Sequence, residues 1–312
     1  MSEYFEIYRG VANAWECDIM GHLNVQFYTG KASEAMGHLR AAIGLPPSVI
    51  RARRLSVIAV HARSRYLREL HAGDILFMRA GLLSMEEKSL GVHIEIVNAE
   101  SGEVACDFEL GTVCFDLDAR RAVAWPDDVR RRIVERLCQR RVSARAASTD
   151  LPGMPPPEGR TYAAPFVSAQ GSVMQWECDE FEHMSARFFV TRASDAVGHV
   201  KAAFGLDRAS SKANHWGTAA LEYSIHFLQE MQAGDIWRLE SGMLGVGRKT
   251  FRFGHRLINV ETGALCATYD AVGCMFDLRS RRSLELPPAI REGALQHLIA
   301  WPPEEIAGRL AA

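Results

Sequence analysis

Apolar residues between positions 28 and 43 recur at intervals of three and four. This spacing places them on one face and predicts an amphipathic α-helix. Asn24 stands before the pattern as a residue type that caps helices, and Gly44-Leu45-Pro46-Pro47 ends it. The apolar positions are Tyr28, Ala32, Ala35, Met36, Leu39, Ala42 and Ile43.

Four strand-like segments follow this helix. The short polar separators between them, such as Gly73-Asp74 and Glu86-Glu87, favour antiparallel hairpins over helical crossovers. A helix-like segment from Asp127 to Arg141 closes the unit. One long helix against a curved antiparallel sheet is an α+β unit. The strand-like segments span about 55–68, 75–85, 88–98 and 103–117.

The whole pattern occurs twice. Residues 15–45 recur at 176–206 without a gap, at a constant offset of 161, and 15 of the 31 positions are identical. The same offset aligns the FDL sequences at 115–117 and 276–278. Two copies with so long a period indicate two fused domains related by a pseudo-two-fold axis.

These repeats set the expected domain bounds. The stretch 142–165 contains five prolines and no apolar period, and it is interpreted as a linker. The prediction is a first domain at 1–141, a linker at 142–165 and a second domain at 166–312.

Composition narrows the class of protein. The chain has 36 basic and 38 acidic residues, so no overall charge points to nucleic acid or to a membrane surface. No apolar run approaches the ~20 residues of a membrane span, and the N-terminus lacks an apolar signal region. Seven cysteines without CxxC spacing favour reduced thiols in a cytoplasmic protein.

The segment from Asp18 to Asn24, followed by an aromatic residue at Tyr28, resembles the loop-to-helix signature of hotdog-fold acyl-CoA thioesterases. The most similar group is that of the 4-hydroxybenzoyl-CoA thioesterases. The resemblance implies two fused hotdog units, each a long central helix wrapped by a curved antiparallel sheet. It also implies an acyl-CoA substrate and no cofactor or metal, and it leaves open a homo-oligomer of the pseudo-dimeric chain.

The family's catalytic carboxylate falls on Asp18 and, in the second half, on Asp179. A carboxylate can attack a thioester directly or deprotonate a water molecule, and the sequence leaves both routes open. Backbone N–H groups at the helix start would hold the oxyanion. The expected catalytic residues are Asp18, His22, Asn24, Asp179 and His183, and the expected substrate-binding residues of the first loop and helix are Gly21, Val25, Gln26 and Tyr28.

The two loops differ at positions that would touch a ligand. Glu182 replaces Gly21 and Ser185 replaces Asn24, which puts the second site in doubt. In the family each site also borrows strand residues across the interface. The borrowed segments would be 221–226 for the first site and 59–66 for the second, with Glu222 and His61 at equivalent positions.

Other residues allow two interpretations. Cys17 and Cys178 are interpreted as buried thiols rather than nucleophiles or metal ligands, and Trp15 and Trp176 as core anchors. A basic stretch is either a solvated face or a phosphate contact. For the whole protein the alternatives to a thioesterase are a hotdog hydratase or dehydratase and a non-catalytic acyl-CoA-binding protein. The basic stretch comprises Arg51, Arg53, Arg54, Arg63, Arg65 and Arg68.

Overall fold

The computed structural model describes residues 3–141 and 154–301. Each half contains a short first strand, a 3-10 turn, a long central helix and four longer strands, arranged in the same order. The first half contains β1 (Phe5–Val11), η1 (Ala14–Glu16), α1 (Val25–Ala42), α2 (Pro47–Arg53), β2 (Leu55–Tyr66), β3 (Ile75–Met85), β4 (Ser89–Asn98), β5 (Val104–Asp116), β6 (Arg121–Ala122) and α3 (Asp127–Val134). The second half contains β7 (Phe166–Ser172), η2 (Gln175–Glu177), α4 (Ala186–Ala203), α5 (Arg208–Asn214), β8 (Trp216–Phe227), β9 (Ile236–Val246), β10 (Thr250–Asn259), β11 (Leu265–Asp277) and α6 (Pro288–Gln296).

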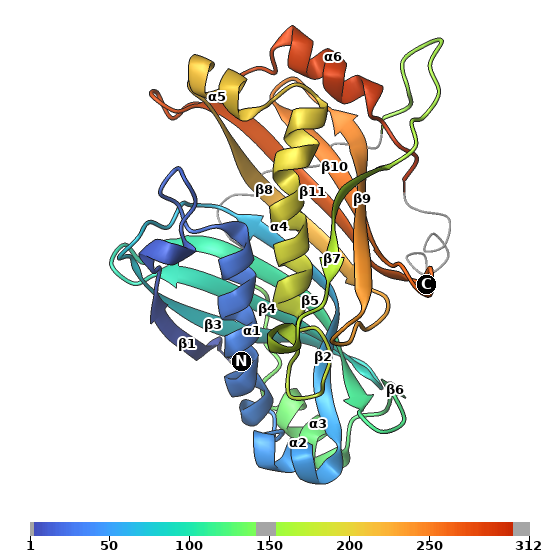
Figure 1. Cartoon of the computed structure of the whole chain (residues 1–312). Coiled ribbons are helices and arrows are strands. Elements are labelled where there is room, and N and C mark those ends of the chain that lie inside the picture. Colours follow the sequence, from blue (N-terminus) through green and yellow to red (C-terminus); the bar gives the residue numbers. More distant parts are fainter. Residues whose placement is uncertain (1–2, 142–153, 302–312) are drawn as a thin grey trace.

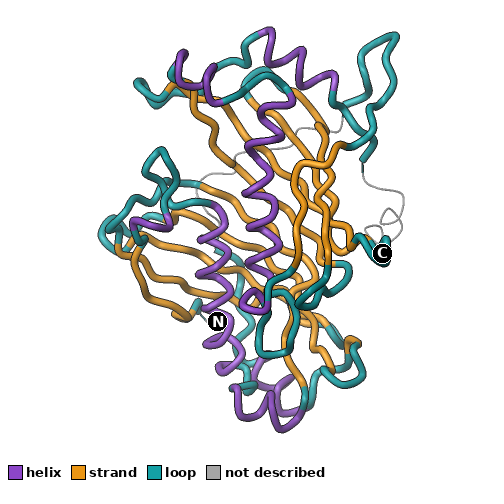
Figure 2. Tube along the Cα trace, in the orientation of Figure 1, coloured by secondary structure: helices purple, strands orange, loops and turns teal. Residues whose placement is uncertain are grey.

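All these strands form one antiparallel sheet. Its order is β1-β3-β4-β5-β2-β8-β11-β10-β9-β7, with β6 paired to β5, so the two halves join between β2 and β8. The long helices α1 and α4 lie side by side against the sheet and run in opposite directions, while α2 with α3 and α5 with α6 occupy opposite ends (Figure 1). Figure 2 shows the same arrangement as helices against one strand layer. The predicted α+β architecture of two hotdog units is confirmed.

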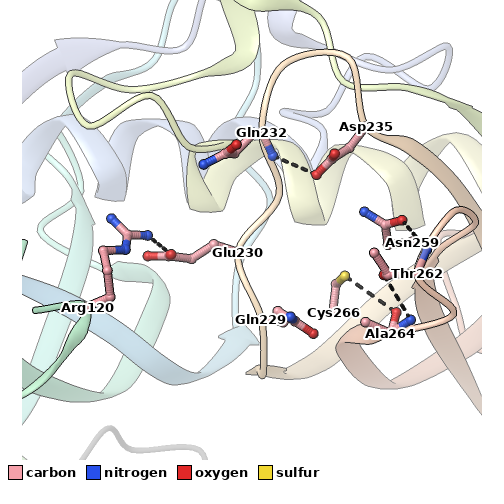
Figure 3. Close-up of a pocket in the computed structure, with 9 residues that line it drawn as sticks. All are labelled: Arg120, Gln229, Glu230, Gln232, Asp235, Asn259, Thr262, Ala264 and Cys266. Atoms are coloured by element: carbon pink, nitrogen blue, oxygen red, sulfur yellow. Dashed lines mark hydrogen bonds and ion pairs between the residues drawn. The ribbon is translucent and has the colours of Figure 1, made fainter.

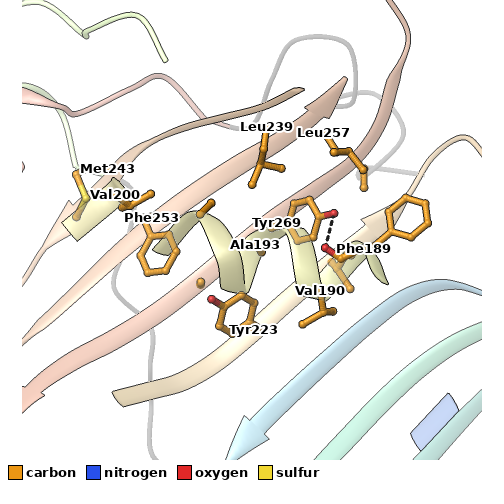
Figure 4. Packing of buried hydrophobic residues seen from close by; sticks show 14 of the residues in the cluster. Phe189, Val190, Ala193, Val200, Tyr223, Leu239, Met243, Phe253, Leu257 and Tyr269 are labelled. Atoms are coloured by element: carbon orange, nitrogen blue, oxygen red, sulfur yellow. Dashed lines mark hydrogen bonds between the residues drawn. The ribbon is translucent and has the colours of Figure 1, made fainter. Parts of the chain in front are cut away.

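Each helix covers its own apolar core. In the second half, Ala193 and Ala196 of α4 are fully buried, and these small residues let the sheet approach the helix closely (Figure 4). The Tyr269 hydroxyl donates a hydrogen bond of 3.0 Å to the Phe189 carbonyl oxygen, so this buried polar group is satisfied. Tyr66 of β2 packs against both cores and thereby links them.

The sequence pattern did not predict the shorter helices and strands, and the interpretation of two tryptophans as core residues was wrong. The predicted helix from Asp127 ends at Val134 rather than at Arg141, because the chain then turns and Leu137 pairs with Leu82 of β3. Trp15 and Trp176 are 77% and 69% exposed, so they are not core anchors.

Part of the predicted linker is described. Residues 154–165 contain no helix or strand, and the Met154 N–H donates to the Leu244 carbonyl at 2.9 Å, so this part lies against the second unit. Residues 142–153 lie outside the described residues. The domain boundaries themselves stay a prediction. None of the described helices has the length and apolar character needed to cross a membrane.

The seam between the halves is centred on the pseudo-two-fold axis. Arg63 of β2 pairs with Ser224 of β8, two residues that occupy equivalent positions in the repeat. Beside them the His61 and His226 rings lie with centroids 4.4 Å apart. The pKa of His61 is lowered to about 4, mainly by burial. The charges of His226 and Arg63 also lower this pKa, while Glu109 raises it. Burial also lowers the pKa of His226.

We expect this seam to make the protein acid-sensitive. Both histidines have folded-state pKa values below the unfolded value of about 6.5, so the neutral rings stabilise the fold fully above pH 6.5. That contribution is lost as the pH falls toward about 4, the folded value of His61. Urea denaturation at a series of pH values should show the free energy of unfolding falling by roughly 2 kcal/mol from this source between pH 7 and pH 4.5. A His61→Gln variant should show a flatter profile, and an unchanged profile would contradict the assignment.

Candidate functional site

The loop before α1 holds Asp18 in a fixed orientation. Asp18 Oδ1 accepts hydrogen bonds from the backbone N–H groups of Met20 at 2.8 Å and His22 at 3.2 Å. The Asp18 N–H in turn donates to the His22 carbonyl at 2.7 Å. Within the described chain the other carboxylate oxygen, Oδ2, has no hydrogen-bonding partner. The aspartate therefore caps its own turn with one oxygen and keeps the second available.

The second loop repeats this geometry. Asp179 Oδ1 accepts from the N–H groups of Phe181 at 2.9 Å and His183 at 3.3 Å. Burial raises the pKa of the Asp179 carboxyl despite these two hydrogen bonds. Both loops thus keep the backbone that places a carboxylate ahead of a helix.

The start of α1 supplies fewer free backbone donors than expected. Asn24 caps α1 by accepting from the Gln26 N–H at 3.1 Å, and it also accepts from the Ser194 hydroxyl of α4 at 3.1 Å. The Asn24 N–H donates to the Glu16 carbonyl. Of the N–H groups of Asn24, Val25 and Gln26, which form the helix start expected to hold an oxyanion, only that of Val25 lacks a partner among the described residues. In α4 the Ser185 side chain makes no capping bond, which also frees the Arg187 N–H.

Gly21 has a backbone conformation that favours glycine. Its φ is +83°, and Glu182 adopts φ +66° at the equivalent point. A Cβ at Gly21 would meet nothing within 4 Å, so a substitution there costs backbone strain and not steric overlap. We expect Gly21→Ala to lower the free energy of unfolding by about 1 kcal/mol. Urea denaturation would measure this, with Glu182→Gly as the matched variant that should lose no stability.

The two histidines are held by arginines from the opposite half. The Arg281 guanidinium lies 2.8 Å from His22 Nε2 and forms an ion pair with Glu69. An arginine only donates hydrogen bonds, so His22 Nε2 must accept and the ring is neutral. Burial lowers the pKa of His22, and Arg281 adds to this while Glu69 and Asp18 oppose it. These contacts hold His22 as a neutral ring at the end of the loop.

The same cluster exists in the second site with the halves exchanged. The Arg120 guanidinium lies 2.8 Å from His183 Nε2 and pairs with Glu230. Arg120 and Arg281 both have positive φ values, 53° and 57°. Non-glycine residues in this region are uncommon and cluster where function requires them. Sequence reasoning missed both arginines, although they follow the repeated FDL motif at the same offset.

The charge on Arg281 also bears on metal binding. Ligand atoms of His22, Glu69 and His71 lie within 4.8 Å of one another, a separation that suits a metal ion. The Arg281 guanidinium already contacts His22 and Glu69, so the centre of this cluster is occupied by a positive charge. In the second half Gln232 replaces His71. A metal ion at this cluster would have to displace the Arg281 guanidinium.

The expected strand residues lie on the other side of the sheet. The Tyr66 ring meets Tyr28 of α1 at 5.3 Å between centroids, so Tyr66 points toward the helices. Side chains alternate along a strand, and His61 and Glu222 therefore point away from them. His61 contacts Ser224 at 2.9 Å, and Glu222 accepts two hydrogen bonds from Arg63. The expectation that His61 and Glu222 line the sites is not met.

Other expected site residues have structural contacts. Tyr28 is buried in the first core, and burial raises the pKa of its hydroxyl well above the ordinary value. Val25 and Gln26 are half-buried at the start of α1. Cys17 and Cys178 are half-buried free thiols whose pKa values burial raises, which disfavours the reactive thiolate.

The basic stretch does not form one phosphate-binding patch. Five of its arginines pair with carboxylates in different parts of the molecule, which neutralises their charge. These pairs are Arg53–Asp128, Arg54–Asp118, Arg63–Glu222, Arg65–Asp107 and Arg68–Glu103.

A polar pocket of about 310 Å³ adjoins the second site (Figure 3). Arg120 enters it from the first half, while Glu230 and the other lining residues come from the second. In the first half, Arg68 and Glu103 form an ion pair at the equivalent place, 3.3 Å apart. Gln229 and Ala264 replace that pair, which explains the space in the second half. A smaller pocket of about 220 Å³ is also lined by Arg120, together with other residues of both halves.

A double hotdog with a carboxylate-bearing loop ahead of each central helix is the architecture of a thioester hydrolase. The chain belongs to the thioesterase-like superfamily, whose family model matches residues 12–133 and 173–293. The family resemblance inferred from the sequence is therefore confirmed.

Individual relatives agree with this family. A segment of 118 residues is 30% identical to an L-carnitine dehydrogenase/betainyl-CoA thioesterase of Agrobacterium fabrum, covering 38% of this chain and 24% of that protein. The chain thus spans about a quarter of that relative's length. A putative oleoyl thioesterase of Lactobacillus plantarum has a similar fold, with a TM-score of 0.68 and 11% identity over 88% of this chain and 96% of that one. The 12:0-ACP thioesterase of Umbellularia californica gives a TM-score of 0.66 and 12% identity, covering 88% and 94%.

Proposed function

We propose that the protein hydrolyses the thioester bond of an acyl-CoA, releasing the free acid and the CoA thiol. The thioesterase family of both halves supports hydrolysis. Coenzyme A as the carrier is supported by the Agrobacterium relative, which is described as a betainyl-CoA thioesterase. The proposal rests mainly on the two carboxylate oxygens of Asp18. One oxygen accepts the loop's hydrogen bonds, and the other has no hydrogen-bonding partner among the described residues.

Two routes are consistent with this carboxylate. In the first, Asp18 attacks the thioester carbonyl carbon, the C–S bond breaks, and water then hydrolyses the mixed anhydride. In the second, Asp18 takes a proton from a water molecule whose oxygen attacks the same carbon. In both, the thiolate leaves and is protonated by solvent. The Val25 N–H at the positive end of α1 would stabilise the oxyanion, and Asn24 and His22 would keep the loop in place.

We also propose that the two sites are unequal, with the Asp18 site active and the Asp179 site weakened or serving another ligand. Glu182 adds an anion and a strained backbone where Gly21 leaves open space. The substitution of Ser185 for Asn24 removes the side-chain cap of the helix. Retention of the scaffold alongside these changes supports a second site that no longer performs the same chemistry.

Measurement of CoA thiol release across a panel of acyl-CoAs tests the main proposal. Aliphatic, aromatic, dicarboxylic and betainyl thioesters should be included, and the products identified by mass spectrometry. Release of the free acid supports hydrolysis. Formation of a hydrated or dehydrated acyl-CoA would instead identify a hydratase or dehydratase, and tight binding without turnover would identify a binding protein.

A further inference from the structure

Each long helix directs a basic side chain at the loop of the opposite half. Arg40 of α1 and Lys201 of α4 occupy equivalent positions, 161 residues apart. The Arg40 guanidinium lies 3.8 Å from the carboxylate of Glu180, which is the residue that follows Asp179. Its guanidinium also donates to the Ser56 hydroxyl at 3.3 Å. In the second site, therefore, the loop itself supplies the counter-ion for this basic group.

The first site lacks that counter-ion. The residue after Asp18 is Ile19, which is 99% exposed and carries no charge. Lys201 Nζ contacts the Thr218 hydroxyl at 3.5 Å and forms no ion pair with any carboxylate in the part of the chain that the structure describes. Because the two halves are related by a pseudo-two-fold axis, Lys201 of α4 approaches the Asp18 loop as Arg40 of α1 approaches the loop that holds Glu180. Burial lowers the pKa of Lys201, and the charge of Asp18 opposes that effect.

We propose that Lys201 makes the first site selective for thioesters with an anionic group close to the reacting carbonyl, and that this anion is a carboxylate of a short dicarboxylic acyl chain. The inference rests on the proposed thioesterase function. A half-buried ammonium that forms no ion pair within the described chain gains a charge-assisted hydrogen bond from such a carboxylate. In coenzyme A the phosphates are separated from the sulfur by the whole pantetheine arm, whereas Lys201 is directed at the loop that holds Asp18, beside which the thioester carbon would lie.

The second site serves as an internal comparison. Glu180 occupies the position from which a substrate carboxylate would approach Arg40, so this site is already neutralised. The change from Glu180 to Ile19 between the loops is thus the feature that opens the first site to an anion. Introducing the acid into the first loop should close it in the same way.

The test compares glutaryl-CoA with pentanoyl-CoA, which have the same chain length and differ in the terminal carboxylate. We expect a preference for glutaryl-CoA in kcat/KM of about tenfold or more, the size of one charge-assisted hydrogen bond. Lys201→Gln and Ile19→Glu should each abolish this preference, mainly by raising KM for glutaryl-CoA. Lys201→Arg should retain it, and Ile19→Gln is the uncharged control for the exposed loop position.

The same acyl groups carried on N-acetylcysteamine, which has no phosphates, show whether Lys201 binds the acyl carboxylate or a phosphate of coenzyme A. The glutaryl preference should persist on this carrier. Loss of the Lys201 effect on N-acetylcysteamine, with an equal effect on both CoA substrates, would assign Lys201 to a phosphate and overturn the proposal. So would a wild-type preference for pentanoyl-CoA or betainyl-CoA. Absence of thiol release from every acyl-CoA would instead contradict the proposed function, which keeps the two failures distinct.

Discussion

Replacement of Asp18 by asparagine is expected to lower turnover by about 10²-fold or more while acyl-CoA binding is retained. Asparagine keeps the oxygen that accepts from Met20 and His22, so the turn should keep its shape. It removes the charge and the oxygen that would attack the substrate or take a proton from water. Steady-state kinetics give turnover, and equilibrium binding of a non-hydrolysable acyl-CoA analogue checks the site.

Asp179→Asn is the matched control, because Asp179 makes the same two loop contacts. If the sites are unequal as proposed, this variant should retain most of the wild-type turnover. Equal losses of about half in the two variants, together with two acyl-CoA molecules bound per chain, would contradict the inequality. Near-normal turnover of a folded Asp18→Asn protein, with loss in Asp179→Asn, would move the chemistry to the second site.

Lys31→Met should strongly destabilise the first unit. Lys31 of α1 is 4% exposed and lies 2.9 Å from the carboxylate of Glu16, which is 9% exposed. Glu16 also accepts from the Asn13 N–H at 2.8 Å, just ahead of the Asp18 loop. Removing the lysine leaves a buried carboxylate without its counter-ion, which typically costs about 3–5 kcal/mol. Urea denaturation should show that loss in the free energy of unfolding.

Lys31→Arg is the control for this pair. The second unit already contains an arginine at this position, because Arg192 pairs with Glu177 at the equivalent buried site. The arginine variant should keep most of the stability because the charge and the hydrogen bond remain. A loss below about 1 kcal/mol in Lys31→Met would show that the pair does not hold the loop in place.

The large features of the fold were predictable because they follow from local pattern and repetition. Apolar spacing identified α1, and short polar turns identified the four strands that follow it. The duplicated loop located Asp18 and Asp179 in equivalent surroundings. A repeat at constant offset also predicts a shared interface, which the continuous sheet through β2 and β8 confirms.

The residues that cross the interface were less predictable. The pairing of β2 with β5 shifts register between Ala59 and His61, and that of β8 with β11 shifts opposite Leu221, between Val272 and Gly273. A bulge of one residue changes which side chains face the helices, and sequence spacing does not reveal it. The family resemblance identified the segments that contain His61 and Glu222, but not the face of the sheet on which each side chain lies. Arg120 and Arg281 were missed because turns after β5 and β11 bring them to sites formed by distant segments.

The continuous sheet through β2 and β8 has a consequence for how the protein behaves on dilution. In a homodimer, sites built from two subunits disappear when the subunits separate at low concentration. Here both partners belong to one chain, so their encounter is intramolecular and the local concentration of each for the other is set by the connection. Specific activity should therefore not depend on protein concentration. In a fused chain a substitution changes only one of the two halves, whereas in a homodimer every substitution appears in both subunits.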